Sequence, residues 1–335
     1  MLNRLTLLAA LLVVMSTELC VACNLCSPVA GNTMLTDLDA ADVAFLAELD
    51  VPTPVRKNPT AFDLLNRDRQ KGTAGFRIRT MLRGEADASE GDAVVVPLRV
   101  PGPSGTLHLI THNSSTDLWR SYRLSDDGLQ FALGAAALPI LPPKEPSSRS
   151  IVQRLAHCLR FLGTDDYQLR QAIFGEFSRA PYSTLQRLKP QLDREQVHQW
   201  MQPASRKAEE ARLIFLLLAV CGDQADVPML QQEFRQCVES NWAGTLDGVI
   251  LAYVALGGRD ALDDVDQRLL SSDDPSLEMK RAAAKSLKFL VNHESNIERP
   301  RLLLSCRLLL NDAETAQLII DDYAQWQNWQ RTGSD

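Results

Sequence analysis

Apolar residues recur at every second position through much of the chain between about residue 36 and residue 135. The runs that show this alternation are DVAFLAEL, GFRIRTML, DAVVVPLRV and GTLHLI. Such alternation is typical of strands with one buried face, and glycine- and proline-rich turn signals separate the runs. Short strands at this spacing predict a small antiparallel β-barrel or sandwich. We assign it to residues 23–136.

The spacing of apolar residues changes to a helical period from Ser150 onward. Segments such as SIVQRLAHCLRFLG and EEARLIFLLLAVCG predict about ten helices with short connections over residues 150–330. Between the halves, residues 137–149 read ALPILPPKEPSSR and contain four prolines and two serines. This composition interrupts regular structure and marks a linker. The chain is therefore predicted to be α+β, with its strands and its helices in separate, separable domains.

Similar breaks recur within the helical half, in the segments LGTDD, CGDQAD and LGGRD. The last two begin 35 residues apart, at Cys221 and Leu256, which is near the period of two-helix repeats. In this rhythm the helical half resembles HEAT-type repeats. The resemblance implies an all-α solenoid with a long curved surface that binds other proteins. The whole layout, including FSRAPYSTLQRLKPQLDREQV, resembles an uncharacterised group of exported bacterial proteins, and this resemblance implies no activity.

The β half comes after a group of cysteines and contains VAFLAEL, then FRIRTMLRGE leading through a turn to DAVVVPL. This order resembles the OB-like barrel of netrin-type and metalloproteinase-inhibitor modules. In the inhibitors, the amine and carbonyl of an N-terminal cysteine chelate the zinc of the target, and the resemblance implies this role for Cys23. The chain departs from the pattern because no cysteine lies between Ser27 and His157, so the cross-links of that family cannot form.

The first residues have the pattern of a secretory signal peptide. Arg4 supplies a positive charge, an apolar run extends to Met15, and Cys20-Val21-Ala22 places small residues at the −3 and −1 positions. We therefore assign residues 1–22 to a signal peptide, which predicts an exported protein whose mature chain begins at Cys23. Two alternatives stay open: an uncleaved N-terminal anchor, and a lipoprotein in which acylated Cys23 tethers the protein to a membrane.

Cys23 and Cys26 are too few to make a closed zinc site, which needs four ligands. The next cysteine is Cys158, so no second CxxC pair exists. We expect a local disulfide between Cys23 and Cys26, or lipidation of Cys23 beside a spare thiol. We predict no metal site and no cofactor.

Other candidate residues favour structural roles. His108 and His112 are four residues apart, and on a strand this spacing separates them by about 13 Å, too far to share one ion. Cys158, Cys221, Cys237 and Cys306 fall on or beside apolar helix faces, as buried free cysteines do, although a bridge between the second and third is an alternative. No nucleophile, metal or phosphate-binding motif occurs, so we predict that the protein is not an enzyme.

The C-terminal segment YAQWQNWQ carries an aromatic residue at every third position, namely Tyr323, Trp326 and Trp329. On a helix these side chains form one stripe. They either cover the core of the last repeat, as a solenoid end requires, or make a surface for a partner.

These observations together predict a non-catalytic exported module that binds or organises proteins of the cell envelope. The formal net charge of −7 argues against a nucleic-acid partner. The alternative function is an N-terminal-cysteine inhibitor or metal-binding module of the netrin and metalloproteinase-inhibitor type.

The processing prediction can be tested on the native protein. We expect N-terminal sequencing and intact mass to give a chain that begins at Cys23. A mass increment matching acyl chains on Cys23 would identify the tethered form. A native chain that retains Met1 would contradict cleavage.

Overall fold

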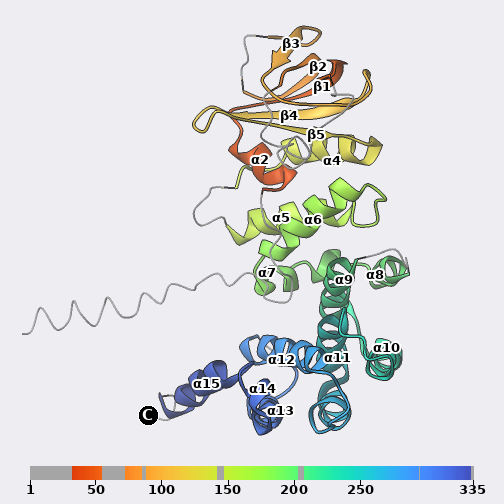
Figure 1. The fold of residues 1–335 in the computed structure, drawn as a ribbon, viewed down its shortest axis with the longest axis vertical. Helices are drawn as coiled ribbons and strands as arrows, with labels where there is room; N and C mark the ends of the chain where they lie inside the picture. Colours follow the sequence, from red (N-terminus) through yellow and green to blue (C-terminus); the bar gives the residue numbers. More distant parts are fainter. Residues whose placement is uncertain are drawn as a thin grey trace, which may run out of the picture.

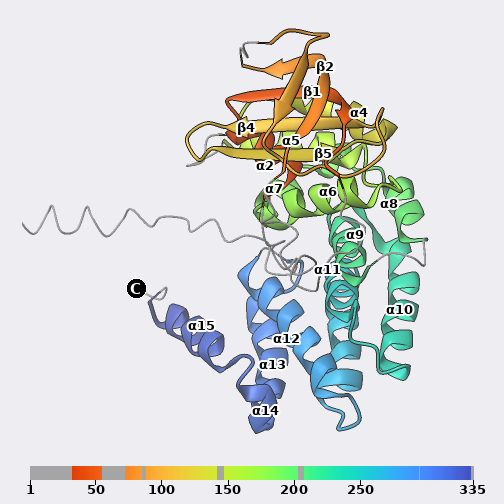
Figure 2. The ribbon, with the colours of Figure 1, turned by 45° about the horizontal axis from the view of Figure 1, so that its top comes forward.

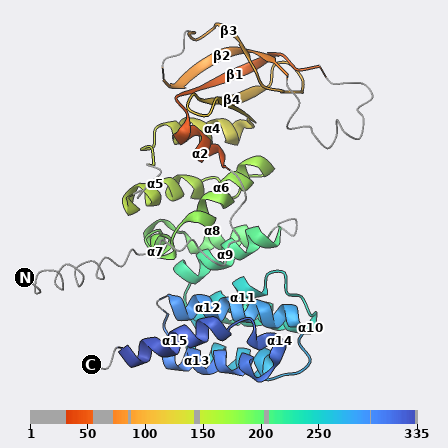
Figure 3. The same cartoon turned by 60° about the vertical axis from the view of Figure 1, so that its left-hand side comes forward.

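A computed structural model describes residues 32–54, 72–84, 88–141, 147–202, 207–293 and 295–332, with side chains described as far as residue 326. The strands lie at one end of the molecule and the helices continue along its longest axis (Figure 1). Figure 3 shows the order of the layers: the sheet, then α2 and α4, then α5 and α6, then the remaining helices.

The N-terminal half contains a curled, five-stranded antiparallel sheet that forms a half-barrel. Its strand order is β3-β2-β1-β4-β5. The prediction that this half contains an antiparallel sheet is confirmed. The strands are β1 (Val43–Val51), β2 (Ala74–Arg83), β3 (Ala93–Val96), β4 (Leu107–Asn113) and β5 (Leu118–Arg123).

Strand β1 is central because both of its faces are apolar. Phe45 and Leu49 pack on one face with Phe76 of β2 and form a small core. Leu46 points to the other face, where it pairs with Leu109 of β4 and joins a larger core. Side chains alternate between the two faces of a strand, so one strand contributes to two separate cores.

Two helices cover the face of the sheet that carries Leu46. They are α2 (Met34–Ala40) and α4 (Asp126–Ala136). Thr33 caps α2 through a capping box with Thr36, and the Ser125 hydroxyl accepts from the Gly128 main-chain N–H at the start of α4. Such caps satisfy main-chain donors that a helix leaves open at its start, which fixes where each helix begins.

The C-terminal half is mostly helical, as predicted. Its α-helices are α5 (Ser148–Leu159), α6 (Tyr167–Arg179), α7 (Tyr182–Gln186), α8 (Arg194–Met201), α9 (Ala208–Cys221), α10 (Val227–Glu239), α11 (Leu246–Val265), α12 (Leu277–Asn292), α13 (Arg299–Leu308), α14 (Ala313–Ala316) and α15 (Ile320–Thr332). Short 3-10 helices η2 (Lys189–Gln191), η3 (Gln224–Asp226) and η5 (Leu309–Asn311) and the π-helix η4 (Asp266–Leu270) connect some of them. In Figure 2, α10, α11 and α12 succeed one another across the array.

Glycines end helices at two of the predicted breaks. α9 stops at Gly222, whose main-chain N–H bonds to the carbonyl of Leu218. Within α11, Gly258 adopts φ 64° and ψ −140°, so the helix is interrupted there. A positive φ is costly for any residue with a Cβ, which explains a glycine at this position.

One apolar core continues from the sheet into the helices. Phe131 of α4 is fully buried, and its ring lies 4.8 Å from that of His157 on α5. The His157 Nε2–H donates to the main-chain oxygen of Phe131 at 2.9 Å. The same core includes Leu46 and extends through α9, α11 and α12. The β unit and the helices therefore share an apolar interface, although a linker was predicted between them at residues 137–149.

Removal of the Phe131 ring should weaken both sides of this interface. We expect Phe131→Ala to cost about 3–5 kcal/mol and to raise amide hydrogen exchange in β4 and in α5 together, as measured by mass spectrometry. Phe234→Ala is the matched control, because Phe234 is equally buried but lies on α10 against Tyr253. Its effect should be confined to α10 and α11. Exchange that rises only within residues 32–136 in Phe131→Ala would instead show two independent domains.

Candidate functional sites

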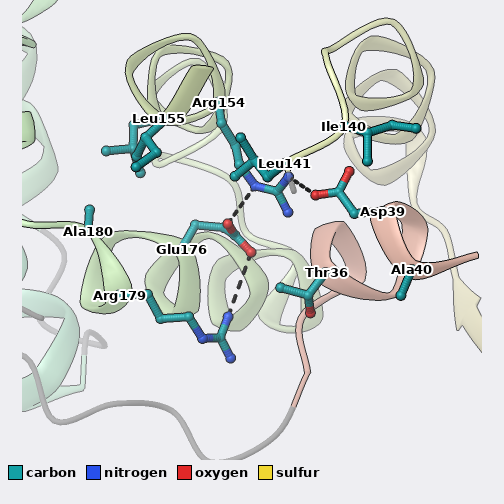
Figure 4. Close-up of a pocket in the computed structure, with 11 residues that line it drawn as sticks. Thr36, Asp39, Ala40, Ile140, Leu141, Arg154, Leu155, Glu176, Arg179 and Ala180 are labelled. Carbon is teal, nitrogen blue, oxygen red and sulfur yellow. Dashed lines mark hydrogen bonds and ion pairs between the residues drawn. The ribbon is translucent and has the colours of Figure 1, made fainter. Parts of the chain in front are cut away.

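A pocket with a cavity of about 430 Å³ lies between α2, α5 and α6. Figure 4 shows its side chains. The apolar part of its wall comes from the segment after α4 and from α5, and the polar part comes from α2, α5 and α6. The apolar wall includes Ile140, Leu141, Ile151 and Leu155. The pocket therefore lies where the β unit meets the first helices.

Arg154 of α5 is the central polar residue of this pocket and is only 3% exposed. Its Nε donates to Oε2 of Glu176 on α6 at 2.6 Å. Its Nη1 donates to Asp39 on α2. The hydroxyl of Thr33 donates to the other oxygen of Glu176. One guanidinium thus joins three helices, and Figure 4 shows it between the two carboxylates.

The two carboxylates of this cluster stabilise the charged form of Arg154. Burial by itself would lower the pKa of Arg154, but Glu176 and Asp39 hold that pKa above its ordinary value. Arg179 adds a second guanidinium, with Nη1 3.8 Å from Glu176. Two cations and two carboxylates therefore stand together at the pocket.

One nitrogen of Arg154 has no hydrogen-bond partner in the part of the chain that the structure describes. This atom, Nη2, is buried. In Figure 4 it is directed into the space among Glu176, Asp39 and Thr36. Buried donors are almost always satisfied in folded proteins, so the atom calls for an explanation.

A second, smaller cavity of about 240 Å³ lies where α7, α9, α11 and α12 meet. Its base is aromatic: the rings of Tyr182 and Phe289 are 4.8 Å apart, and those of Phe289 and His293 are 4.4 Å apart. Burial lowers the pKa of His293, which favours the neutral ring. Its rim carries the exposed side chains of Gln186 and Lys189. We call this feature the aromatic groove.

Buried carboxylates elsewhere in the helical half are used between helices. In the described residues four carboxylates of this half are buried, and each pairs with a cation on another helix. They are Glu176 with Arg154, Glu210 with Arg170, Asp226 with Arg194, and Asp247 with Arg212 and Lys285. Half-buried Asp266 pairs with Arg301 in the same way. These groups therefore act as structural pairs.

The four cysteines of the helical half lie on or beside its apolar core, as predicted. Cys158, Cys237 and Cys306 are buried and Cys221 is half-buried, and all four are free thiols. Burial raises the pKa of Cys221 to about 11 and of Cys306 to about 12, so neither is a reactive thiolate.

The two histidines on β4 are separate, as the strand spacing predicts. His108 is buried, and its ring nitrogens lie 2.9 Å from the Ser121 hydroxyl and 3.1 Å from that of Thr106. Burial lowers its pKa to about 4. His112 stacks on Trp119, with ring centroids 4.2 Å apart.

The predicted aromatic stripe falls on α15. Trp326 is only 5% exposed and its Nε1–H donates to Oδ1 of Asn292 at 2.9 Å, so it serves as a core residue next to α12. Tyr323 is half-buried against the same core. The side chain of Trp329, and Cys23 and Cys26, lie outside the described residues.

Comparisons of the chain with protein-family models, with curated proteins and with solved structures gave no match. Within the described ranges, no three His, Cys, Asp or Glu side chains converge in a way that could hold a metal ion. Across the same residues, no helix combines the length and the apolar character needed to span a bilayer.

The Arg154 cluster was not anticipated from the sequence, although a signal for it exists. Arg154 lies three residues after Ile151 and four before Cys158, on the apolar face of its predicted helix. Glu176 lies three residues after Ile173 in the same way. A charged residue within an apolar stripe needs a buried partner, but the sequence does not say which one.

Asp226 offers a test of these structural pairs, since it is 1% exposed and its carboxylate accepts from Arg194. Burial by itself would raise the pKa of Asp226, but hydrogen bonds from Arg194, a main-chain N–H and His198 hold it below its ordinary value. A lowered folded pKa means that the ionised carboxylate stabilises the fold above about pH 4, the ordinary range for Asp. That stabilisation is lost as the pH falls through the folded pKa.

We therefore expect Asp226→Asn to lower the free energy of unfolding by about 2 kcal/mol at pH 7. The difference from the wild type should narrow below about pH 4. Denaturant titrations at several pH values measure both effects. Asp260→Asn, at an exposed position of α11, should stay within about 0.5 kcal/mol of the wild type. An Asp226→Asn difference that is constant down to about pH 3, which is below the unperturbed pKa of about 3.9 for Asp, would contradict a structural role for the ionised carboxylate.

Proposed function

We propose that this protein is an exported, non-catalytic scaffold that binds a protein of the cell envelope through its helical half. In this proposal the helical half is a HEAT-like solenoid and forms a domain of its own, joined to the β domain by an apolar interface. Export rests on the N-terminal sequence pattern. The protein-binding role rests on the buried charges and the aromatic groove of the helical half.

The observation that carries the proposal is the use of buried charges. The buried carboxylates in the described part of the helical half pair with cations across helix interfaces. Such pairs hold helices in one arrangement, and each of these carboxylates already contacts a cation. A rigid array of this kind suits the presentation of a surface better than proton transfer, which needs a titratable group beside a substrate.

The aromatic groove is the part of the array best suited to a partner. Its base is formed by Tyr182 and Phe289, and aromatic residues supply much of the binding energy in protein interfaces. At its rim, the exposed ammonium of Lys189 favours an anionic group. We infer that the groove accepts one apolar side chain of an extended partner segment that also carries a carboxylate.

A pair of charge reversals tests this assignment. Lys189→Glu places a negative charge at the groove, whereas Arg187→Glu makes the same change at an exposed residue nearby that does not line it. A photo-crosslinking residue at Gln186, at the rim, should capture the partner from envelope extracts of the source cells. We expect capture to fall at least about tenfold in Lys189→Glu, as for an interface charge, and to be unchanged in Arg187→Glu.

Equal capture by both variants would contradict binding at the groove. A third protein, with Cys23→Ser and Cys26→Ser together, distinguishes the scaffold from the inhibitor alternative. The scaffold should capture its partner normally with these changes. Loss of capture in that double variant alone would favour the N-terminal-cysteine module.

A further inference from the structure

We propose that the pocket between α2, α5 and α6 binds a small amphipathic molecule with an apolar chain and a neutral carbonyl oxygen, which accepts a hydrogen bond from Nη2 of Arg154. This site is distinct from the aromatic groove and does not depend on the proposed protein-binding function.

The first argument is the unsatisfied donor. Arg154 is 3% exposed, and two of its nitrogens donate to Glu176 and Asp39 while Nη2 has no partner among the described residues. A guanidinium donor without an acceptor in a buried site is costly. An oxygen placed in the cavity next to Nη2 removes this cost.

The second argument is the shape and lining of the cavity. Its volume of about 430 Å³ lies within the range of small-molecule sites, which is about 300–1,000 Å³. Its walls include Ile140, Leu141, Ile151 and Leu155. Such sites are usually apolar with a few polar groups that fix orientation. Here the apolar wall suits an alkyl chain, and Arg154 fixes its polar end.

The third argument is charge. Arg154 and Arg179 are already balanced by Glu176 and Asp39. A ligand carboxylate would add an uncompensated negative charge to a buried cluster, and a ligand ammonium would bring a donor where an acceptor is needed. A neutral carbonyl satisfies Nη2 without disturbing the balance. Esters and amides both supply this group.

Four probes with the same alkyl chain separate these possibilities: octanamide, methyl octanoate, sodium octanoate and octylamine. Isothermal titration calorimetry on the full chain should show binding of octanamide or methyl octanoate. Tighter binding of the ester would indicate a lipid-like source, and tighter binding of the amide a peptide-like one. We expect octanoate to bind at least about tenfold more weakly, the equivalent of one hydrogen bond, and octylamine not to bind.

Two variants connect binding to the pocket. Ile140 lines the wall and is 55% exposed, so Ile140→Ser should weaken binding without loss of the fold. Leu304→Ser is the matched control, because Leu304 is 58% exposed on α13 and does not line the cavity. Arg154→Lys keeps the charge but removes the unpartnered donor, and should cost about tenfold in affinity for the carbonyl probes.

Several outcomes would overturn the proposal. The first is that no probe binds at millimolar concentration, which is expected if a water molecule satisfies Nη2. The second is equal binding of all four head groups. The third is that Ile140→Ser and Leu304→Ser bind the probes with equal affinity. If Arg154→Lys does not fold, the comparison of head groups on the wild type and the Ile140→Ser variant still decides the matter.

Discussion

Buried carboxylates paired with cations on neighbouring helices hold the helical half of this protein in register. Asp247, at the start of α11, is an example. Its carboxylate accepts hydrogen bonds from Arg212 of α9 at 2.8 Å and from Lys285 of α12 at 2.9 Å. Breaking a buried pair leaves an uncompensated charge, which costs several kcal/mol. If α11 slid along α9, Asp247 would lose its contact with Arg212. Apolar packing alone tolerates many arrangements of similar volume, so we infer that these pairs select one of them.

The same interaction joins the β unit to the helices. Arg154 donates to Asp39, which belongs to α2 beneath the sheet, and to Glu176, which belongs to α6. The apolar core is continuous across this contact through Phe131 and Leu155. The hydrophobic contacts supply most of the stabilisation because they scale with buried area. The charged contact adds a directional constraint between α2, α5 and α6. The β unit and the first helices are therefore in contact through both an apolar core and a buried ion pair.

Local pattern predicted most strands and the helices after residue 150, but it missed α2, α4 and β5 within the segment assigned to strands, and it did not predict the contacts between elements. Alternation in VAFLAEL predicts a strand, and β1 lies there. Gly222 and Gly258 mark helix breaks, because glycine commonly ends a helix and tolerates a positive φ. In contrast, Arg154 and Glu176 are 22 residues apart and Asp39 is 115 residues from Arg154. No periodicity links residues at such separations, since each partner is chosen by how the helices pack. The pocket could therefore not be predicted from the sequence, although the position of Arg154 within an apolar stripe indicates that it has a buried partner.

The chemistry of the pocket depends on the choice of arginine at this contact. A guanidinium presents five N–H donors in a rigid planar fork. Two carboxylates on two different helices engage Nε and Nη1, and their positions are fixed by the helices that carry them. Planarity then fixes Nη2 as well, so it cannot turn to find another acceptor. Lysine would offer one ammonium on a flexible stem, so an N–H left over from the two carboxylates would not be held in one direction. A residue that joins three helices therefore directs an unused donor into the space between them, and the apolar residues of α5 and of the segment after α4 determine which molecules can reach it.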